Sequence, residues 1–156
     1  MNVTVGDLMT SEIVVAGPDE TVGTVRQRMI DHGIHALPLV DADGHAVGIV
    51  TSTDLLPGHG DDRSVVSICS RKVYVVPRYS GVHVAARVMR NHGLHHVVVT
   101  HEKKVVGVLS TFDLLRLVED HRFSLKNPPA KKKLRQFVRK NKRYERNPET
   151  EFDPPD

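Results

Sequence analysis

The sequence predicts a mixed α/β (α+β) fold, made of two β-α-β-β-α repeats and a basic C-terminal extension. The first observation behind this prediction is an internal repeat with a period of about 60 residues. The second is the alternation, within each repeat, of β-branched runs with segments whose apolar residues recur at helical spacing. The third is a change in the sign of the charge after residue 123.

The repeat is defined by residues that coincide when the chain is shifted along itself. A shift of 60 residues superimposes Val15 on Val75, Val22 on Val82, Met29 on Met89, His32-Gly33 on His92-Gly93 and His35 on His95. After a one-residue deletion the shift is 59, and it superimposes Val47-Gly48 on Val106-Gly107 and Asp54-Leu55-Leu56 on Asp113-Leu114-Leu115. Because the deletion falls between apolar runs, a hairpin turn can absorb it. Each unit is small for an independent core, which favours packing against its twin.

Charge divides the chain further. Residues 1–123 contain 12 Lys and Arg and 14 Asp and Glu, a balance of −2, whereas residues 124–156 contain 10 and 5, a balance of +5. The net charge of +3 therefore describes the tail and not the repeats. Together with the repeat, this predicts a first unit over residues 1–60, a second over 61–123 and a basic, partly disordered tail over 124–156.

Each repeat is expected to open with a strand and a helix. The short runs Glu12–Ala16 and Lys72–Val76 predict the strands. Polar helix starts follow at Pro18–Glu20 and Arg78–Ser80. Helical spacing then relates Val22, Val25 and Met29 in the first repeat, and Val82, Ala85 and Met89 in the second. Gly33 and Gly93 end the helices, because a C-terminal cap commonly needs a positive φ.

A β-hairpin and a final helix complete each repeat. Apolar runs predict strands at Ala36–Val40 and His45–Val50, and at His96–Thr100 and Val105–Leu109. Turns are expected at Asp41–Gly44 and His101–Lys104. The final helices begin at Thr51 and Ser110; Pro57-Gly58 ends the first early, whereas the second can extend to about Asp120.

Composition excludes several classes of protein. Cys69 is the only cysteine, so an internal disulfide is impossible and a reducing compartment is expected. The first residues lack the basic and apolar regions of a signal peptide. No apolar run approaches the roughly 20 residues that span a bilayer. We therefore expect a soluble, cytoplasmic protein with no membrane span.

Several segments, in register in both repeats, resemble the CBS domain. In the first repeat these are Met9-Thr10, Gly33–Asp41 (GIHALPLVD) and Gly48–Leu56 (GIVTSTDLL); in the second they are Gly93–Val99 (GLHHVVV) and Gly107–Leu115 (GVLSTFDLL). The resemblance covers about residues 5–121. It implies a Bateman module, in which two CBS repeats pack through their sheets about a pseudo-twofold axis and leave two clefts.

The resemblance also implies a function and partners. Such modules bind AMP, ADP, ATP or another adenosyl ligand in these clefts, and many stand-alone pairs form homodimers. We expect no further cofactor and no enzyme activity, because the sequence has no nucleophile–base pair, no phosphate-binding G-x-x-x-x-G-K-[ST] loop and no dinucleotide fingerprint. Since no catalytic or transport domain accompanies the repeats, the signal is expected to pass to a separate effector protein.

By resemblance, each cleft is shared by the two repeats. The first site would contain Thr10, Val15, Ser110 and Asp113, and the second Ser70, Val75, Thr51 and Asp54. Each Asp would accept the ribose hydroxyls, each helix start would attract phosphate, and the valines would contact adenine. A plainer interpretation stays open: Thr51-x-x-Asp54 and Ser110-x-x-Asp113 are also capping boxes, and the valines fit a strand core. Capping and ribose binding can hold together.

Three of the ten histidines, His35, His95 and His96, begin strands beside the predicted clefts. In relatives a His-Arg pair here often reaches phosphate, but Ala36 and His96 stand at the Arg position. Since His is at most partly charged near neutral pH, weak and pH-sensitive phosphate binding is expected. Partly buried structural histidines are the alternative. No metal site is expected at His92, His95 and His96, because a helix end separates them and no Cys or carboxylate joins them.

The tail supports the main alternative function. In it the protein is a dimerising scaffold or adaptor without nucleotide function, whose basic tail binds a protein or nucleic acid. Leu134, Phe137 and Val138 predict a short basic amphipathic helix, which suits nucleic acid, an anionic membrane face or an acidic protein. A plain solvated, flexible extension is the other interpretation of this composition, and it needs no partner. Because Phe137 and Tyr144 are its main aromatic residues, sequence-specific RNA recognition is not expected.

Overall fold

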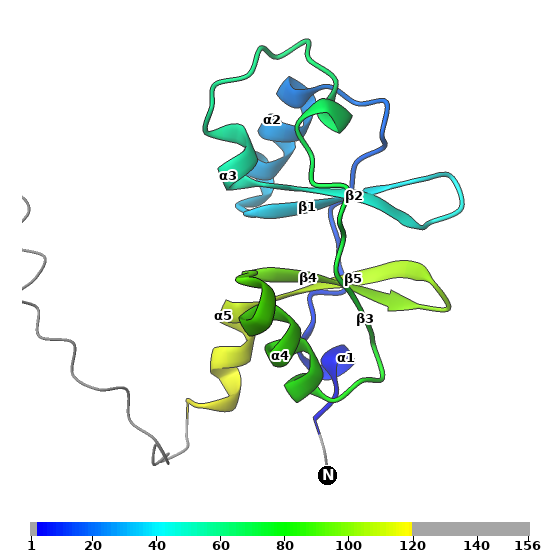
Figure 1. The fold of residues 1–156 in the computed structure, drawn as a ribbon, viewed down its shortest axis with the longest axis vertical. Helices are drawn as coiled ribbons and strands as arrows, with labels where there is room; N and C mark the ends of the chain where they lie inside the picture. The colour runs from blue at the N-terminus through cyan, green and yellow to red at the C-terminus, as the bar shows by residue number, and fades with distance from the viewer. Residues whose placement is uncertain (1–2, 120–156) are drawn as a thin grey trace, which may run out of the picture. The chain divides into compact units, whose positions relative to one another are not determined.

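The computed structural model describes residues 3–119, which fold into two similar halves (Figure 1). The first half contains α2 (Val22–His32), β1 (Ala36–Val40), β2 (Ala46–Thr51) and α3 (Ser52–Leu55). The second contains β3 (Val75–Pro77), α4 (Val82–His92), β4 (His96–His101), β5 (Lys104–Ser110) and α5 (Thr111–Leu114). Three further short helices complete the set: α1 (Val5–Leu8), η1 (Val65–Ser67) and η2 (Leu115–Leu117). The basic tail predicted over residues 124–156 lies outside the described residues.

The sheets of the two halves lie between their helices (Figure 1), so the predicted α/β class and packing through the sheets are confirmed. In the first half β1 is antiparallel to β2, with Leu37 opposite Val50. In the second half β4 is antiparallel to β5, with Val97 opposite Leu109, and parallel to β3. Both hairpins carry a register shift at the same place, after Leu39 and after Val99.

The hairpin turns absorb the one-residue deletion, as predicted. The turn in the second half is tight, with Glu102 and Lys103 at φ of 49° and 68°. The first turn is longer, and there Asp41 Oδ1 accepts hydrogen bonds from the N–H groups of Asp43 and His45 at 3.0 and 2.8 Å. This side chain fixes the longer loop, since Asp readily bonds the backbone two residues on.

The long helices end where the glycines predict and begin later than expected. Gly33 and Gly93 cap them with φ of 60° and 64°. Helix α2 begins after Thr21, whose hydroxyl accepts the Thr24 N–H, and not at Pro18–Glu20. The reason is tertiary: the carbonyl of Glu20 accepts the N–H of Val65 at 3.0 Å, which holds the chain outside the helix at this point.

Two other predicted elements are corrected. No strand forms over Glu12–Ala16; a single bridge joins Ala16 to Leu39, and the second-half strand β3 begins at Val75 instead of Lys72. These segments cross between the halves, so most of their backbone has no neighbouring strand. The final helix α5 ends at Leu114 and continues only as η2, short of the predicted Asp120.

The opening segments of the two repeats are exchanged between the halves. In Figure 1, α1 lies beside α4 of the second half. Its Val5 and Leu8 belong to the core of that half, which we call the second core; the other members are Val76, Ala85, Met89, Val97, Val99 and Leu109. Conversely, Val65 of η1 belongs to the first core, with Ala16, Val25, Met29, Leu37, Leu39 and Val50. Each half thus depends on the other repeat for part of its interior.

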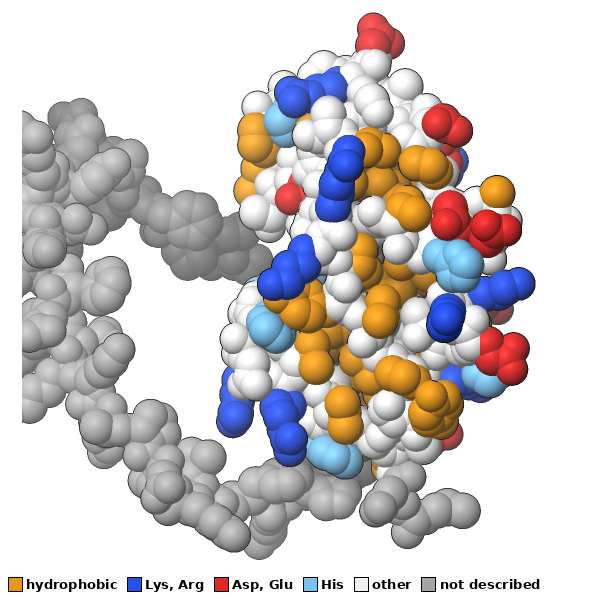
Figure 2. All heavy atoms as spheres, turned by 45° about the vertical axis from the view of Figure 1, so that its right-hand side comes forward, with side chains coloured by type: hydrophobic (Ala, Val, Ile, Leu, Met, Phe, Trp, Pro, Cys, Tyr) orange, Lys and Arg blue, Asp and Glu red, His pale blue; other side chains and the backbone are white. Residues whose placement is uncertain are grey.

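The surface is mixed in charge. Figure 2 shows Lys, Arg, Asp, Glu and His side chains interspersed with apolar ones on one face. This matches the near balance of charge in residues 1–123. Among residues 3–119, no helix has the length and hydrophobicity required to cross a bilayer.

Candidate functional site

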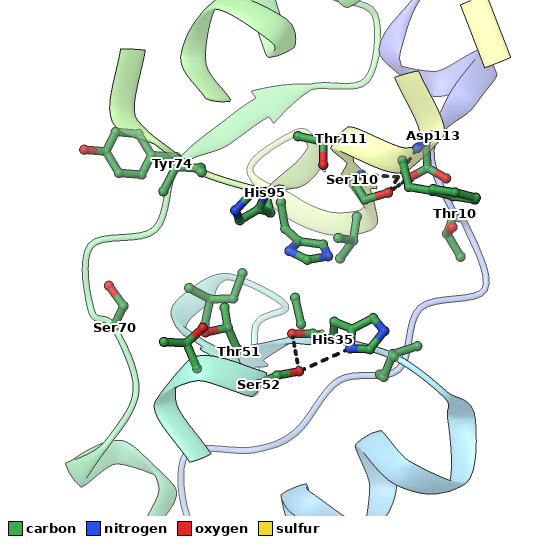
Figure 3. A pocket seen from close by; sticks show the side chains of 18 of the residues that line it. Thr10, His35, Thr51, Ser52, Ser70, Tyr74, His95, Ser110, Thr111 and Asp113 are labelled. Carbon is green, nitrogen blue, oxygen red and sulfur yellow. Dashed lines mark hydrogen bonds between the residues drawn. The ribbon is translucent and has the colours of Figure 1, made fainter. Parts of the chain in front are cut away.

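A cavity of about 1060 Å³ lies between the two halves and brings most of the predicted site residues together (Figure 3). Most of its lining residues occur in pairs separated by 59 or 60 positions, so the cavity follows the sequence repeat. The pairs are Thr10/Ser70, Glu12/Lys72, Val14/Tyr74, Ile34/Leu94, His35/His95, Ala36/His96, Ile49/Val108, Thr51/Ser110, Ser52/Thr111, Thr53/Phe112 and Asp54/Asp113. Its volume is at the upper end of the range for small-molecule sites.

Asp54 and Asp113 each hold a capping box at the start of a short helix. The Oδ2 atom of Asp54 accepts the N–H and the hydroxyl of Thr51, at 2.7 and 2.9 Å. The Oδ2 atom of Asp113 accepts the same two groups of Ser110, both at 2.7 Å. Oδ1 of each Asp accepts no hydrogen bond from residues 3–119, and both residues line the cavity. The capping interpretation therefore holds, and it leaves one oxygen of each carboxylate for a ligand.

A third capping box lies outside the cavity and shows that helix capping can occur without a ligand site. At the start of α1, Asp7 Oδ2 accepts the N–H and hydroxyl of Thr4 at 2.8 and 2.7 Å. These hydrogen bonds lower the pKa of Asp7 below its usual value. Since Asp7 does not line the cavity, its carboxylate is a cap alone. Cap geometry by itself therefore does not identify a ligand site.

Thr10 and Ser70 reach the cavity because the exchanged segments pair with the edge strands. Thr10 exchanges two backbone hydrogen bonds with Val108 of β5, at 3.0 and 3.2 Å. Ser70 makes the same pair of bonds with Ile49 of β2, both at 3.0 Å. In Figure 3, Thr10 lies on the side of Ser110 and Asp113, and Ser70 on the side of Thr51. Each predicted group of hydroxyls and carboxylate is thus assembled from both repeats.

Two glycines permit this close approach. A Cβ atom added to Gly107 would lie 2.6 Å from Met9 Sδ and 2.9 Å from the Thr10 carbonyl oxygen. One added to Gly48 would lie 2.9 Å from Cys69 Sγ and 3.4 Å from the Ser70 carbonyl oxygen. The glycine of each G-h-h-[TS]-x-x-D segment therefore has a steric role, because it admits the exchanged segment against the strand.

The three predicted histidines line the cavity. Figure 3 shows His35 and His95 on opposite walls. His35 Nδ1 lies 3.3 Å from Ser52 Oγ. Burial lowers the pKa of His96, and the neighbouring His95 and His35 lower it further, while Asp113 opposes the shift. His96 therefore favours the neutral imidazole near neutral pH.

The predicted adenine-slot residues lie elsewhere. Neither Val15 nor Val75 lines the cavity, and Val75 is 48% exposed. Their preceding neighbours Val14 and Tyr74 line it instead. Side chains alternate along an extended segment, which accounts for Tyr74 in place of Val75, whereas on the first segment Ile13 lines the cavity together with Val14. The repeat relates Val14 to Tyr74 just as it relates Val15 to Val75. The repeat alone therefore could not show which of the two pairs faces the cavity.

Other lining residues were missed by the sequence prediction. They include Ile34 and Leu94 after the helix ends, and Glu12 and Lys72 on the crossing segments. Each is related to its partner by the repeat, which is the signal that could have found them. Among residues 3–119, the one close group of metal-ligating side chains is Asp41, Asp43 and His45 in the first hairpin turn, outside the cavity.

Comparison with known proteins places this geometry in a family. The sequence profile of the CBS domain matches residues 5–57 and 65–120. A CBS domain-containing protein of Dictyostelium discoideum is 30% identical over 134 residues, covering 76% of this chain and 92% of that protein. A homoserine O-acetyltransferase of Methanosalsum zhilinae is 28% identical over 123 residues, which are 78% of this chain but only 25% of that enzyme.

A solved structure extends the comparison to the fold. The CBS domain pair of protein MJ0100, crystallised in complex with 5′-methylthioadenosine and S-adenosyl-L-methionine, superimposes with a TM-score of 0.69 at 26% identity. The match covers 76% of this chain and 97% of the crystallised one.

Proposed function

The chain belongs to the CBS domain family and carries two copies of the domain in tandem, and from this premise we propose that it is a non-catalytic regulatory module that binds an adenosyl ligand. The ligand is an adenine nucleotide (AMP, ADP or ATP) or another adenosyl compound, held in the cavity between the halves. The observation that carries the proposal is the pair of carboxylates, Asp54 and Asp113, each with one oxygen left over from its helix cap.

The chemistry of the cavity suits an adenosine moiety. A carboxylate accepts the two ribose hydroxyls as charge-assisted hydrogen bonds, which are about twice as strong as neutral ones. Beside each carboxylate the wall is apolar, with Ile34, Ile49, Leu94 and Val108 available to a purine. Helices α3 and α5 have only four residues each, so we assign phosphate recognition to lining side chains instead of helix dipoles. The complex of the MJ0100 domain pair with two adenosyl compounds supports this ligand class.

The output of the module is proposed to pass through a homodimer or a separate effector protein. Leu56 and Leu115 occupy equivalent positions in the repeat and are 80% and 54% exposed, and Phe112 and Val118 are exposed beside Leu115 in sequence. Exposed apolar groups at repeat-related positions fit a two-fold interface. A ligand would act on such a contact only through unequal affinity for two arrangements of the halves.

The test replaces the carboxylates one at a time and uses Asp7 as a matched control. Asp54→Asn and Asp113→Asn should each weaken binding of AMP or 5′-methylthioadenosine at their own site by about 10- to 100-fold, because a charge-assisted hydrogen bond is lost. Asp7→Asn should weaken a helix cap in the same way and lower the free energy of unfolding by about 1 kcal/mol, but it should leave the ligand affinity unchanged. Titration calorimetry and ligand-dependent melting temperature measure both quantities.

Two outcomes would contradict the proposal. One is an unchanged melting temperature for the wild-type chain with every adenosyl compound tried. The other is an equal loss of affinity in all three variants, since the loss would then follow helix capping and not ligand contact.

A further inference from the structure

The two ends of the cavity differ in formal charge. We call Thr51, Asp54 and Ser70, together with Lys72 and Tyr74, the Asp54 subsite. The Asp113 subsite consists of Thr10, Ser110 and Asp113, together with Glu12 and Val14. Lys72 is the single Lys or Arg among the lining residues of the described chain, and Glu12 is the single carboxylate besides the two Asp. At the position related by the repeat, one subsite thus has an ammonium where the other has a carboxylate.

The ammonium of Lys72 lies over the ring of Tyr74. Its Nζ lies 5.2 Å from the centroid of the Tyr74 ring, within range of a cation–π interaction. The Tyr74 ring also contacts His92: the hydroxyl lies 3.1 Å from His92 Nδ1 and the ring centroids are 4.3 Å apart. This wall therefore combines an aromatic ring with a positive charge.

No Lys or Arg of residues 3–119 lines the Asp113 subsite. Among residues 3–119, Glu12 forms no ion pair. The nearby carboxylate of Asp113 acts to raise the pKa of His96 and so favours its protonated form. Burial and the two other cavity histidines outweigh this effect, so His96 stays neutral near neutral pH. The formal charge is then zero for Asp54 with Lys72, and −2 for Asp113 with Glu12.

We infer that the two subsites take different classes of adenosyl ligand: the Asp54 subsite takes a phosphorylated adenosine, and the Asp113 subsite takes an adenosyl compound without phosphate, neutral or cationic. The inference rests on the proposed function. Because the repeat relates the two subsites position by position, equivalent ligands would face Lys72 in one and Glu12 in the other. A phosphate dianion is favoured by the first charge and repelled by the second, while a neutral ligand is affected little.

The test compares AMP with 5′-methylthioadenosine on the full chain by titration calorimetry. Lys72→Glu should lower the ratio of AMP affinity to 5′-methylthioadenosine affinity by about 10-fold at low salt, since the charge beside the ligand is reversed. Glu12→Lys should raise the number of AMP molecules bound per chain from one to two. The double variant Glu12→Lys with Lys72→Glu keeps the net charge and should move AMP to the Asp113 subsite. In the wild-type background, Asp113→Asn should weaken AMP binding less than Asp54→Asn does. In the background of the double variant this order should reverse.

The outcomes separate this inference from the proposed function. If both compounds bind but their affinity ratio and stoichiometry are the same in all four proteins, the charge assignment is wrong and the adenosyl function stands. The same conclusion follows if AMP binding in the wild type depends more on Asp113 than on Asp54. If neither compound binds the wild type at all, the proposed function fails and the assignment with it.

Discussion

At the scale of single residues, two glycines at equivalent positions make contacts of unequal closeness. A methyl group on Gly107 meets the backbone oxygen of Thr10 at 2.9 Å, whereas the corresponding backbone oxygen of Ser70 is 3.4 Å from one on Gly48. We expect Gly107→Ala to destabilise the fold by about 1–3 kcal/mol through overpacking, and Gly48→Ala to cost less. Urea denaturation measures both changes.

The same substitution should also affect the site. In Gly107→Ala the backbone of Thr10 must move away from β5, so the hydroxyl of the Asp113 subsite is displaced. Adenosyl binding at that subsite should weaken while the Asp54 subsite keeps its affinity. Equal destabilisation by both alanines, with no effect on either subsite, would contradict the steric role assigned to Gly107.

His96 makes the free energy of unfolding fall as the pH is lowered. Burial first, and then His95 and His35, lower its pKa in the folded protein below the ordinary value of 6.5. Below that value the unfolded chain binds more protons at this group than the folded chain, so the free energy of unfolding falls as the pH falls through the folded-state pKa. The contribution is fully present above pH 6.5. His96→Gln should therefore lose less stability than the wild type between pH 7.5 and pH 5, measured by urea denaturation.

The other nine histidines are common to both proteins and serve as the internal control. A wild type and a His96→Gln variant with parallel pH profiles would show that the pKa of the half-buried His96 is not lowered in the folded protein.

At the scale of elements, the sequence predicted best where local chemistry decides the structure. The long helices end at Gly33 and Gly93 because only a residue tolerant of positive φ fits there. The hairpins follow from two apolar runs separated by turn residues. The prediction of a strand over Glu12–Ala16 was wrong. Its β-branched residues favour an extended chain, but whether that chain pairs with a strand depends on a neighbour distant in sequence.

The site shows the same division between local and tertiary information. Asp54, Asp113 and the three histidines line the cavity as predicted, because each lies in the first turn of a helix or at the start of a strand, and the positions of these elements are locally encoded. The predictions for Val15 and Val75 were wrong by one residue. Which side chains of a crossing segment face the cavity is set by the two halves that the segment connects. The exchange of α1 and η1 between the cores had no local signal at all. Ligand binding by these residues remains a prediction.

At the scale of the whole molecule, the exchanged segments should make the two halves unfold together. Val5 and Val65 are fully buried, each in the core of the opposite half, so neither half keeps its core if the other unfolds. Native-state hydrogen exchange should give the amides of Leu37 and Leu39 in the first core the same opening free energy as those of Val97 and Val99 in the second. Val5→Ala, which costs about 2 kcal/mol of packing, should lower all four values alike. If only the second-core amides respond, the halves are independent folding units and the exchange of segments does not couple them.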